Sequence, residues 1–223
     1  MAILEAKNRY LQIAFNYDVG MAMRILPRIV KHERILIEAG TPYVKREGLD
    51  GIRAMRRMWP GHIVADIKIT DGAEMEVDMV RSAGATAATV MGSSPTETLN
   101  LFIARCKQYN MVSMIDMLGV KDPLKVLMHL KQPPEVVILH RGRDEENTRG
   151  KLIEYRHVTR IRSKFNVVIS AAGGVDLKEA RSAIFNGANI VVVNLVRPGD
   201  PWNGIRTNED VGGIARQFLS TIE

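Results

Sequence analysis

The sequence predicts one (β/α)8 barrel, a TIM barrel of the α/β class, that spans residues 1–223 as a single domain. Short apolar or β-branched runs recur eight times, with starts 23 to 31 residues apart. Amphipathic stretches with helical spacing lie between them. No Pro-, Ser- or Gly-rich or low-complexity stretch divides the chain. Eight such units in 223 residues fit a compact barrel.

The eight runs have the length and residue types of buried strands. They are Leu11–Phe15, Ile35–Ala39, Ile63–Ile67, Ala87–Met91, Val112–Ile115, Val136–Leu139, Val167–Ala171 and Ile190–Val193. Strands that alternate with helices are joined by right-handed crossovers, so we expect a parallel sheet. An open doubly wound sheet is the alternative. It usually has fewer strands, and no G-x-G-x-x-G motif follows the first run.

The helices between the runs are predicted from apolar spacing and from start signals. Ser94 before Pro95, and Asp122 before Pro123, each predict an N-cap residue followed by proline at the first helical position. Apolar residues recur every three or four positions in two sets: Leu49, Ile52, Met55 and Met58, and then Leu177, Ala180, Ile184 and Ala188.

Composition is that of an ordinary globular protein, with 46% hydrophobic and 25% charged residues. No apolar run reaches the roughly 18 residues needed to span a bilayer. The N-terminus shows no apolar leader, so we expect a cytoplasmic protein with no membrane association. Cys106 is the only cysteine and falls in the helical stretch Glu97–Gln108. A buried small hydrophobic residue is favoured there over a catalytic thiol.

The net charge of +6 raises the question of nucleic acid. The basic residues are scattered over helical segments and form no long block, and only 5% of residues are aromatic. The pattern therefore disfavours a nucleic-acid partner. An anionic small-molecule substrate explains a mildly basic protein equally well.

Functional residues of such barrels lie at the C-terminal ends of the strands. At or shortly after the ends of the predicted runs come Asn16, Glu38, Asp66 with Lys68, Gly92–Ser93, Asp116, His140, Gly173–Gly174 and Arg197. Ionisable groups that converge on one barrel mouth lose hydration and repel like charges, unless a cation compensates. These residues are the candidate site.

The run Asp66-x-Lys68-x-x-Asp71 is the sharpest part of this inventory. Residues two apart share a strand face, so Asp66 and Lys68 are predicted to enter the site together. Asp71 falls in the turn before a helix. The alternative, a surface ion pair, contributes almost nothing to stability. It is disfavoured because the run ends a predicted strand.

Three further features predict chemistry at this mouth. The carboxylates of Glu38, Asp66 and Asp71 suit a hard cation such as Mg²⁺. His140 suits an acid or base, with a histidine merely packed in place as the alternative. Gly173–Gly174 and Arg197 match the usual barrel phosphate site, where backbone N–H groups receive the anion.

Five segments resemble the orotidine 5′-phosphate decarboxylase suprafamily from about residue 10 to the C-terminus. They are Leu11-Gln12-Ile13-Ala14, Ile37-Glu38-Ala39-Gly40-Thr41-Pro42, Ala65-Asp66-Ile67-Lys68-Ile69-Thr70-Asp71, Ile115-Asp116-Met117-Leu118 and Leu139-His140-Arg141. Within it the chain is most similar to 3-hexulose-6-phosphate synthases, especially those fused to formaldehyde-activating enzyme.

The resemblance implies a Mg²⁺-dependent lyase that adds formaldehyde to ribulose 5-phosphate through an enediolate. It implies Mg²⁺ on Glu38 and Asp66, an enediolate stabilised by Mg²⁺ and Lys68, and proton transfer by His140. It also implies a homodimer in which Asp71 reaches the partner's site. It further implies a substrate-binding set of seven residues: Asn16, Glu38, Asp116, Arg143, Gly173, Gly174 and Arg197.

Departures from the family pattern leave other readings open. Asn16 stands where the family's first strand normally ends in an aspartate, and Arg143 is more similar to the 3-keto-L-gulonate 6-phosphate decarboxylase branch. Val196 replaces a glycine, and the tail 198–204 is unlike the usual short loop. A related decarboxylase or aldolase with another phosphorylated substrate is the second hypothesis. A non-catalytic binding or regulatory barrel is the third.

Overall fold

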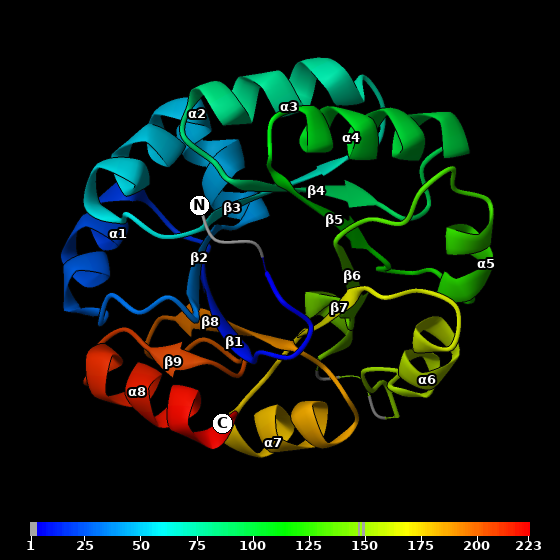
Figure 1. Cartoon of the computed structure of the whole chain (residues 1–223). Helices are drawn as coiled ribbons and strands as arrows, with labels where there is room; N and C mark the ends of the chain where they lie inside the picture. The colour runs from blue at the N-terminus through cyan, green and yellow to red at the C-terminus, as the bar shows by residue number, and fades with distance from the viewer. Residues whose placement is uncertain (1–3, 147, 149) are drawn as a thin grey trace.

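All eight predicted strands are present and close into a parallel barrel in the computed structural model, which describes residues 4–146, 148 and 150–223. The strands pair in chain order from β1 to β8, and β8 pairs back onto β1. Figure 1 shows the strands at the centre with the helices in a ring around them. The predicted TIM barrel is therefore confirmed, as a single domain.

The barrel strands agree with the predicted runs to within three residues at either end. They are β1 Tyr10–Phe15, β2 Ile35–Ala39, β3 Ile63–Ile69, β4 Ala87–Met91, β5 Val112–Asp116, β6 Val136–His140, β7 Val168–Ala172 and β8 Ile190–Val196. The helices are α1 Val19–Ile25, α2 Thr41–Met58, α3 Ala73–Ser82, α4 Thr96–Gln108, α5 Pro123–Met128, α6 Arg156–Arg162, α7 Leu177–Phe185 and α8 Val211–Thr221, with short 3-10 turns η1 Leu26–Arg28 and η2 Arg143–Glu145.

Of the two predicted helix starts, one is confirmed and one is wrong. The Asp122 side chain caps α5 by accepting from the Lys125 amide at 3.3 Å. At α4 the N-cap is Pro95 itself, and the Ser94 hydroxyl instead donates to the Ile69 carbonyl. The α7 repeat was also predicted too long, because that helix ends at Phe185, before Ala188.

Alternation along the strands produces two apolar clusters and a polar upper layer. One cluster lies between the sheet and the helices, and the other fills the barrel interior. Side chains two residues apart share a strand face, and at five strand ends a polar residue follows an interior apolar one. The pairs are Leu36 and Glu38, Val64 and Asp66, Met114 and Asp116, Ile138 and His140, and Val192 and Asn194.

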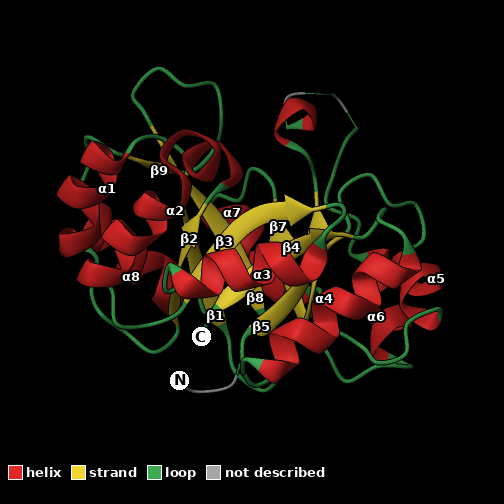
Figure 2. Ribbon diagram, turned by 90° about the horizontal axis from the view of Figure 1, so that it is seen from above, coloured by secondary structure: helices red, strands yellow, loops and turns green. Residues whose placement is uncertain are grey.

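A short ninth strand, β9 Ile205–Arg206, adds to the edge of β8 and was not predicted. In Figure 2 the η2 segment and the loop leading to β9 rise at the same end of the barrel, opposite the chain termini. Cys106 is buried in α4, as predicted, and burial raises the pKa of its thiol. Among the described residues, no helix is long and apolar enough to cross a membrane.

Candidate active site

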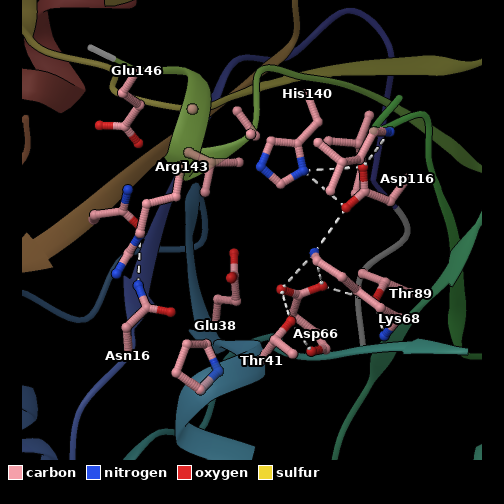
Figure 3. Close-up of a pocket in the computed structure, with 18 of the residues that line it drawn as sticks. Asn16, Glu38, Thr41, Asp66, Lys68, Thr89, Asp116, His140, Arg143 and Glu146 are labelled. Carbon is pink, nitrogen blue, oxygen red and sulfur yellow. Dashed lines mark hydrogen bonds and ion pairs between the residues drawn. The ribbon is translucent and has the colours of Figure 1, made fainter. Parts of the chain in front are cut away.

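The polar strand ends surround a cavity of about 450 Å³ at the mouth of the barrel. Its walls include residues from all eight barrel strands or the loops after them. Figure 3 shows that the labelled side chains from strands far apart in the sequence point into one space. The site predicted from the strand ends is thus a physical cavity.

A continuous chain of charged groups lines one wall of this cavity (Figure 3). The Lys68 ammonium lies 2.9 Å from both carboxylate oxygens of Asp66 and 2.8 Å from Oδ2 of Asp116. Oδ2 of Asp116 in turn lies 2.9 Å from Nδ1 of His140. Two carboxylates and two basic groups therefore form one buried network.

Lys68 reaches this position through an irregular backbone, not through simple alternation. The register between β3 and β4 shifts between Ala65 and Ile69, and Lys68 has a φ of 49°, in the left-handed region. Its amide donates to the Thr89 hydroxyl at 3.0 Å. Non-glycine residues with positive φ are uncommon and occur often at functional sites. Asp66 and Lys68 do meet as predicted, but a bulge brings them together.

Two threonines fix the Asp66 carboxylate from the side away from the lysine. The Thr41 hydroxyl lies 2.7 Å from Oδ2 of Asp66, and the Thr89 hydroxyl donates to Oδ1 at 2.8 Å. Asp66 is only 9% exposed. A carboxylate with both oxygens bonded to neutral donors and an ammonium stays in one orientation.

Burial and neighbouring charges shift the pKa of Lys68, Asp116 and His140 in opposite directions. Burial alone would lower the pKa of Lys68, but Asp66 and Asp116 raise it above its usual value. Burial would raise the pKa of Asp116, yet His140 and Lys68 hold it well below the usual range. Burial likewise lowers the pKa of His140, and Asp116 more than compensates, so the net shift is upward. Near neutral pH, Asp116 is ionised and Lys68 is protonated.

Glu38 stands apart from the network and has a different electrostatic state. It is buried beside Asp66, and burial together with the Asp66 charge raises the Glu38 pKa to about 7. The Gln12 side-chain amide donates to Glu38 Oε2 at 2.5 Å, while Oε1 of Gln12 is buried without a hydrogen-bond partner. A carboxyl group with a raised pKa and an unpartnered amide oxygen therefore both belong to the cavity lining.

These oxygens are the donors that a hard cation prefers, so a Mg²⁺ ion fits the residues present. The described residues contain no group of three or more His, Cys, Asp or Glu side chains placed to hold a metal ion. An ion on Glu38 and Asp66 would therefore take further ligands from water or substrate, as Mg²⁺ commonly does. Asp71, included in the predicted cation set, lies outside this cavity.

Most of the predicted residues are brought together, but three are not. Asn16, Glu38, Asp66, Lys68, Asp116, His140, Arg143 and Gly173 line the cavity. Asp71 is exposed in the turn before α3. Gly174 follows Gly173 in the chain but does not line the cavity. Arg197 faces outward, with its guanidinium 3.1 Å from Asp18 and stacked on Tyr17. The predicted pairing of Arg197 with the glycine turn is therefore not seen within the described cavity.

β8 continues up to the residue before Arg197. The strand stays extended through Val196, which is fully buried and pairs with Arg206 of β9. Arg197 therefore follows a paired strand end, and its guanidinium is bonded to Asp18 and not to the cavity lining.

Several lining residues were not among the predicted site residues: Gln12, Thr41, Thr89, Glu146 and Asn194. Asn194 follows the run Ile190–Val193 directly, so the strand-end rule could have found it. Its side-chain oxygen accepts from the Asn16 amide at 2.9 Å. Gln12 and Thr89 lie inside strands, where one polar residue in a buried run was the only signal. Glu146 lies in a long loop and carried no signal.

The fold and these groups define a TIM barrel with an ionisable active-site cluster at its strand ends. The chain belongs to the orotidine 5′-phosphate decarboxylase / HUMPS family, whose model matches residues 9–194. This confirms the suprafamily inferred from the sequence. The matching family and the relatives described below are named as enzymes, which confirms the prediction that the chain belongs to an enzyme family. The predicted class, a lyase, is consistent with those names.

The chain is similar to proteins named bifunctional enzyme Fae/Hps. It is 35% identical over 216 residues to the protein of Methanothrix thermoacetophila, covering 96% of this chain and 53% of that protein. It is 37% identical over 218 residues to the protein of Methanosphaera stadtmanae, with 94% and 52% covered. The chain thus spans about half the length of the curated relatives it matches.

Solved structures show the same architecture. The 3-hexulose-6-phosphate synthase of Salmonella typhimurium has a TM-score of 0.82 and 25% identity, with 96% of this chain and 98% of that chain covered. The KGPDC of Streptococcus mutans has a TM-score of 0.74 and 18% identity, with 96% and 97% covered. The second likeness concerns the fold alone.

Proposed function

We propose that the chain is a lyase that acts on a phosphorylated sugar through an enediolate, and that its reaction is the 3-hexulose-6-phosphate synthase reaction, formaldehyde plus ribulose 5-phosphate. The observation that carries this proposal is the Lys68 ammonium held between Asp66 and Asp116, with His140 on the same Asp116 carboxylate. The similarity to relatives named Fae/Hps and to a solved synthase supports it.

The reaction requires a proton to leave C1 of ribulose 5-phosphate, and the residues suit this step. Asp116 holds His140 by Nδ1, and Figure 3 shows the other ring nitrogen directed into the cavity. Nε2 of His140 takes the C1 proton, and negative charge develops on the enediolate oxygens. The fixed Lys68 ammonium stabilises this charge.

The second half of the reaction forms a carbon–carbon bond. C1 of the enediolate attacks the formaldehyde carbon, the C2 carbonyl re-forms, and the formaldehyde oxygen takes a proton from His140. One proton is removed and one returned, so the enzyme ends in its starting state. Glu38 and Asp66 would hold Mg²⁺, which supplies Lewis-acid polarisation of substrate oxygens when bound.

A homodimer with shared sites belongs to the same proposal. Asp71 is exposed and closely precedes α3, and α3 and α4 carry exposed Met75, Met79 and Leu101. Exposed apolar side chains gathered on packed helices are typical of a protein–protein contact. A second copy on this surface would cover them and could receive Asp71 in its own site.

The test is formaldehyde consumption with ribulose 5-phosphate, with and without Mg²⁺. Lys68→Ala should abolish turnover, whereas Lys131→Ala, at an exposed lysine that does not line the cavity, should leave it unchanged. Metal-dependent turnover that Lys68→Ala removes would support the proposal. Turnover that is retained in a folded Lys68→Ala protein would reject it.

Arg143 favours one alternative within the same chemistry, decarboxylation of a β-keto sugar acid phosphate. Its guanidinium lines the cavity, where it could meet a carboxylate that ribulose 5-phosphate lacks. Release of carbon dioxide from 3-keto-L-gulonate 6-phosphate, with no formaldehyde consumed in the presence of ribulose 5-phosphate, would select this alternative. A protein that binds sugar phosphates but turns over neither would indicate a binding role.

A further inference from the structure

The loop after β8, residues 197–204, is fastened at the end of the barrel that carries the cavity (Figure 2). The Asp200 carboxylate accepts from the Tyr17 hydroxyl and from the Arg197 amide. The Arg206 guanidinium donates to the carbonyls of Arg197, Asp200 and Trp202. The loop is thus tied to the end of β1 and to β9, and the function proposed above gives it no role.

Three arginines lie near this mouth, and they differ in what their guanidinium groups contact. Arg141 donates to the carbonyls of Gly173 and Lys151, and Arg197 is paired with Asp18. Arg143 makes no side-chain hydrogen bond or ion pair with any residue in the described part of the chain, although it lines the cavity. Of the three, Arg143 alone has its donors available to a ligand in the cavity.

The Arg143 side chain packs against the ring of Trp202. The Arg143 guanidinium carbon is 4.5 Å from the centre of the Trp202 ring, within the range of a cation–π contact. The ring comes from the fastened loop and the arginine from η2, so the contact joins two segments about 60 residues apart. A stacked guanidinium keeps the N–H groups at its edge free to bind an anion.

We propose that Trp202 is a positioning residue that holds Arg143 at the cavity mouth, and that Arg143, in place of Arg197, binds an anionic group of the substrate. This inference rests on the proposed function in that a phosphorylated substrate enters this cavity. The glycine turn at Gly173 supplies the other side of the anion site, since Gly173 lines the same cavity. The unusual tail 198–204 is then the scaffold of Trp202.

The experiment measures binding by calorimetry with two probes, inorganic phosphate and ribulose 5-phosphate, on the full chain. Arg143→Met should weaken binding roughly 10- to 100-fold, as for loss of a charged hydrogen bond. Trp202→Ala should weaken it roughly three- to tenfold, and Trp202→Phe should recover most of the loss. Arg197→Met should retain affinity, and Arg181→Met on α7 is the surface control.

A double-substitution cycle distinguishes positioning from general damage. In the Arg143→Met background, Trp202→Ala should cause no further loss of affinity, because Trp202 acts through Arg143. Without ligand, Arg143→Met should also change the fluorescence of Trp202, taken as the difference between each protein and its Trp202→Phe counterpart. Trp59 is buried and contributes equally to both.

Undiminished binding by folded Trp202→Ala, or loss of binding in Arg197→Met, would overturn the inference. Neither result would bear on the proposed function, which turnover of ribulose 5-phosphate tests separately. Trp202-dependent binding of phosphate without formaldehyde consumption would support the inference and reject only the proposed substrate. Wild-type protein that binds neither probe would overturn both.

Discussion

Nδ1 of His140 lies 2.9 Å from Oδ2 of Asp116, a carboxylate that is 1% exposed. The same oxygen receives the Lys68 ammonium at 2.8 Å. One buried carboxylate therefore controls both the ionisation of the histidine and the position of the lysine. The proposed chemistry depends on that carboxylate remaining charged.

Asp116→Asn should lower the pKa of His140. Burial and the Lys68 charge both disfavour the imidazolium, and the Asp116 carboxylate is the main group that stabilises it. If neutral His140 is the base, the rate of the wild-type enzyme rises as pH increases through its raised pKa. In Asp116→Asn this rise should move to lower pH, with a reduced maximal rate.

The pH–rate profile and an NMR titration of the His140 ring together check this expectation. Asp122→Asn, which changes the cap of α5 and a surface ion pair with Arg160, is the matched control and should leave both unchanged. A His140 titration that stays in place in Asp116→Asn would contradict the assigned electrostatics.

Glu38 should make folding stability fall as pH rises. Its pKa is about 7 in the folded state and 4.5 as the ordinary value, so between these values the folded chain keeps a proton that the unfolded chain has lost. Stability is therefore highest below pH 4.5 for this group and is lost towards pH 7. Glu38→Gln should be more stable than wild type by about 3 kcal/mol at roughly pH 8 and nearly equal at roughly pH 4. Urea denaturation at the two pH values measures the difference.

Mg²⁺ should reverse this destabilisation if Glu38 and Asp66 hold the ion. Binding to the ionised carboxylates would stabilise the folded state above neutral pH, with a smaller effect as Glu38 becomes protonated. The thermal midpoint of wild type should rise with Mg²⁺, and that of Glu38→Gln should rise much less. Equal shifts in the two proteins would place the ion elsewhere.

The proposed dimer can be tested by mixing inactive subunits. If Asp71 acts in the partner's site, a heterodimer of Lys68→Ala and Asp71→Ala subunits contains one intact site. Co-expression should then restore about a quarter of wild-type activity, since random association makes half of the dimers mixed. Co-expression of Lys68→Ala with Glu38→Ala is the control. Each of these subunits lacks a residue of its own site, so no mixed dimer contains an intact site and no activity should be restored.

The sequence predicted the barrel because its signals are local and repeat. Strand runs, helical spacing and the Asp122 cap each depend on neighbouring residues, and all were found close to the expected positions. The strand-end rule located Glu38, Asp66, Asp116 and His140 because alternation in a closed parallel barrel leaves no other place for them. These are the parts of the site that the fold itself determines.

What the sequence did not predict depends on contacts between distant loops. Arg197 was expected at the phosphate site, but it follows the end of β8 that pairs with β9, and its guanidinium is bonded to Asp18. Trp202 and Glu146 lie in loops whose paths are set by tertiary contacts. The bulge that places Lys68 was also hidden, because a single left-handed residue in a strand leaves no periodic signal.

Two forces should keep position 173, in the turn after β7, a glycine: backbone conformation and close packing at the proposed anion site. Gly173 has a φ of 107°, and a Cβ there would lie 1.9 Å from the Arg141 carbonyl oxygen. Gly48, with a φ of 59° in α2, has open space around the corresponding position. Both positions disfavour a side chain by backbone strain, but only Gly173 adds a clash with a backbone atom.

Gly48→Ala should therefore cost about 1 to 3 kcal/mol of stability, because its φ of 59° and ψ of -151° fall in a backbone region that is essentially confined to glycine, and it should leave phosphate affinity unchanged. Gly173→Ala should cost at least about 1 kcal/mol more and weaken binding of inorganic phosphate, because the Arg141 strand end must move away from the cavity wall. Denaturant unfolding and calorimetry on the same two proteins measure both effects. Equal stability losses with phosphate affinity retained in Gly173→Ala would show that the turn has room to adjust and that the anion is bound elsewhere.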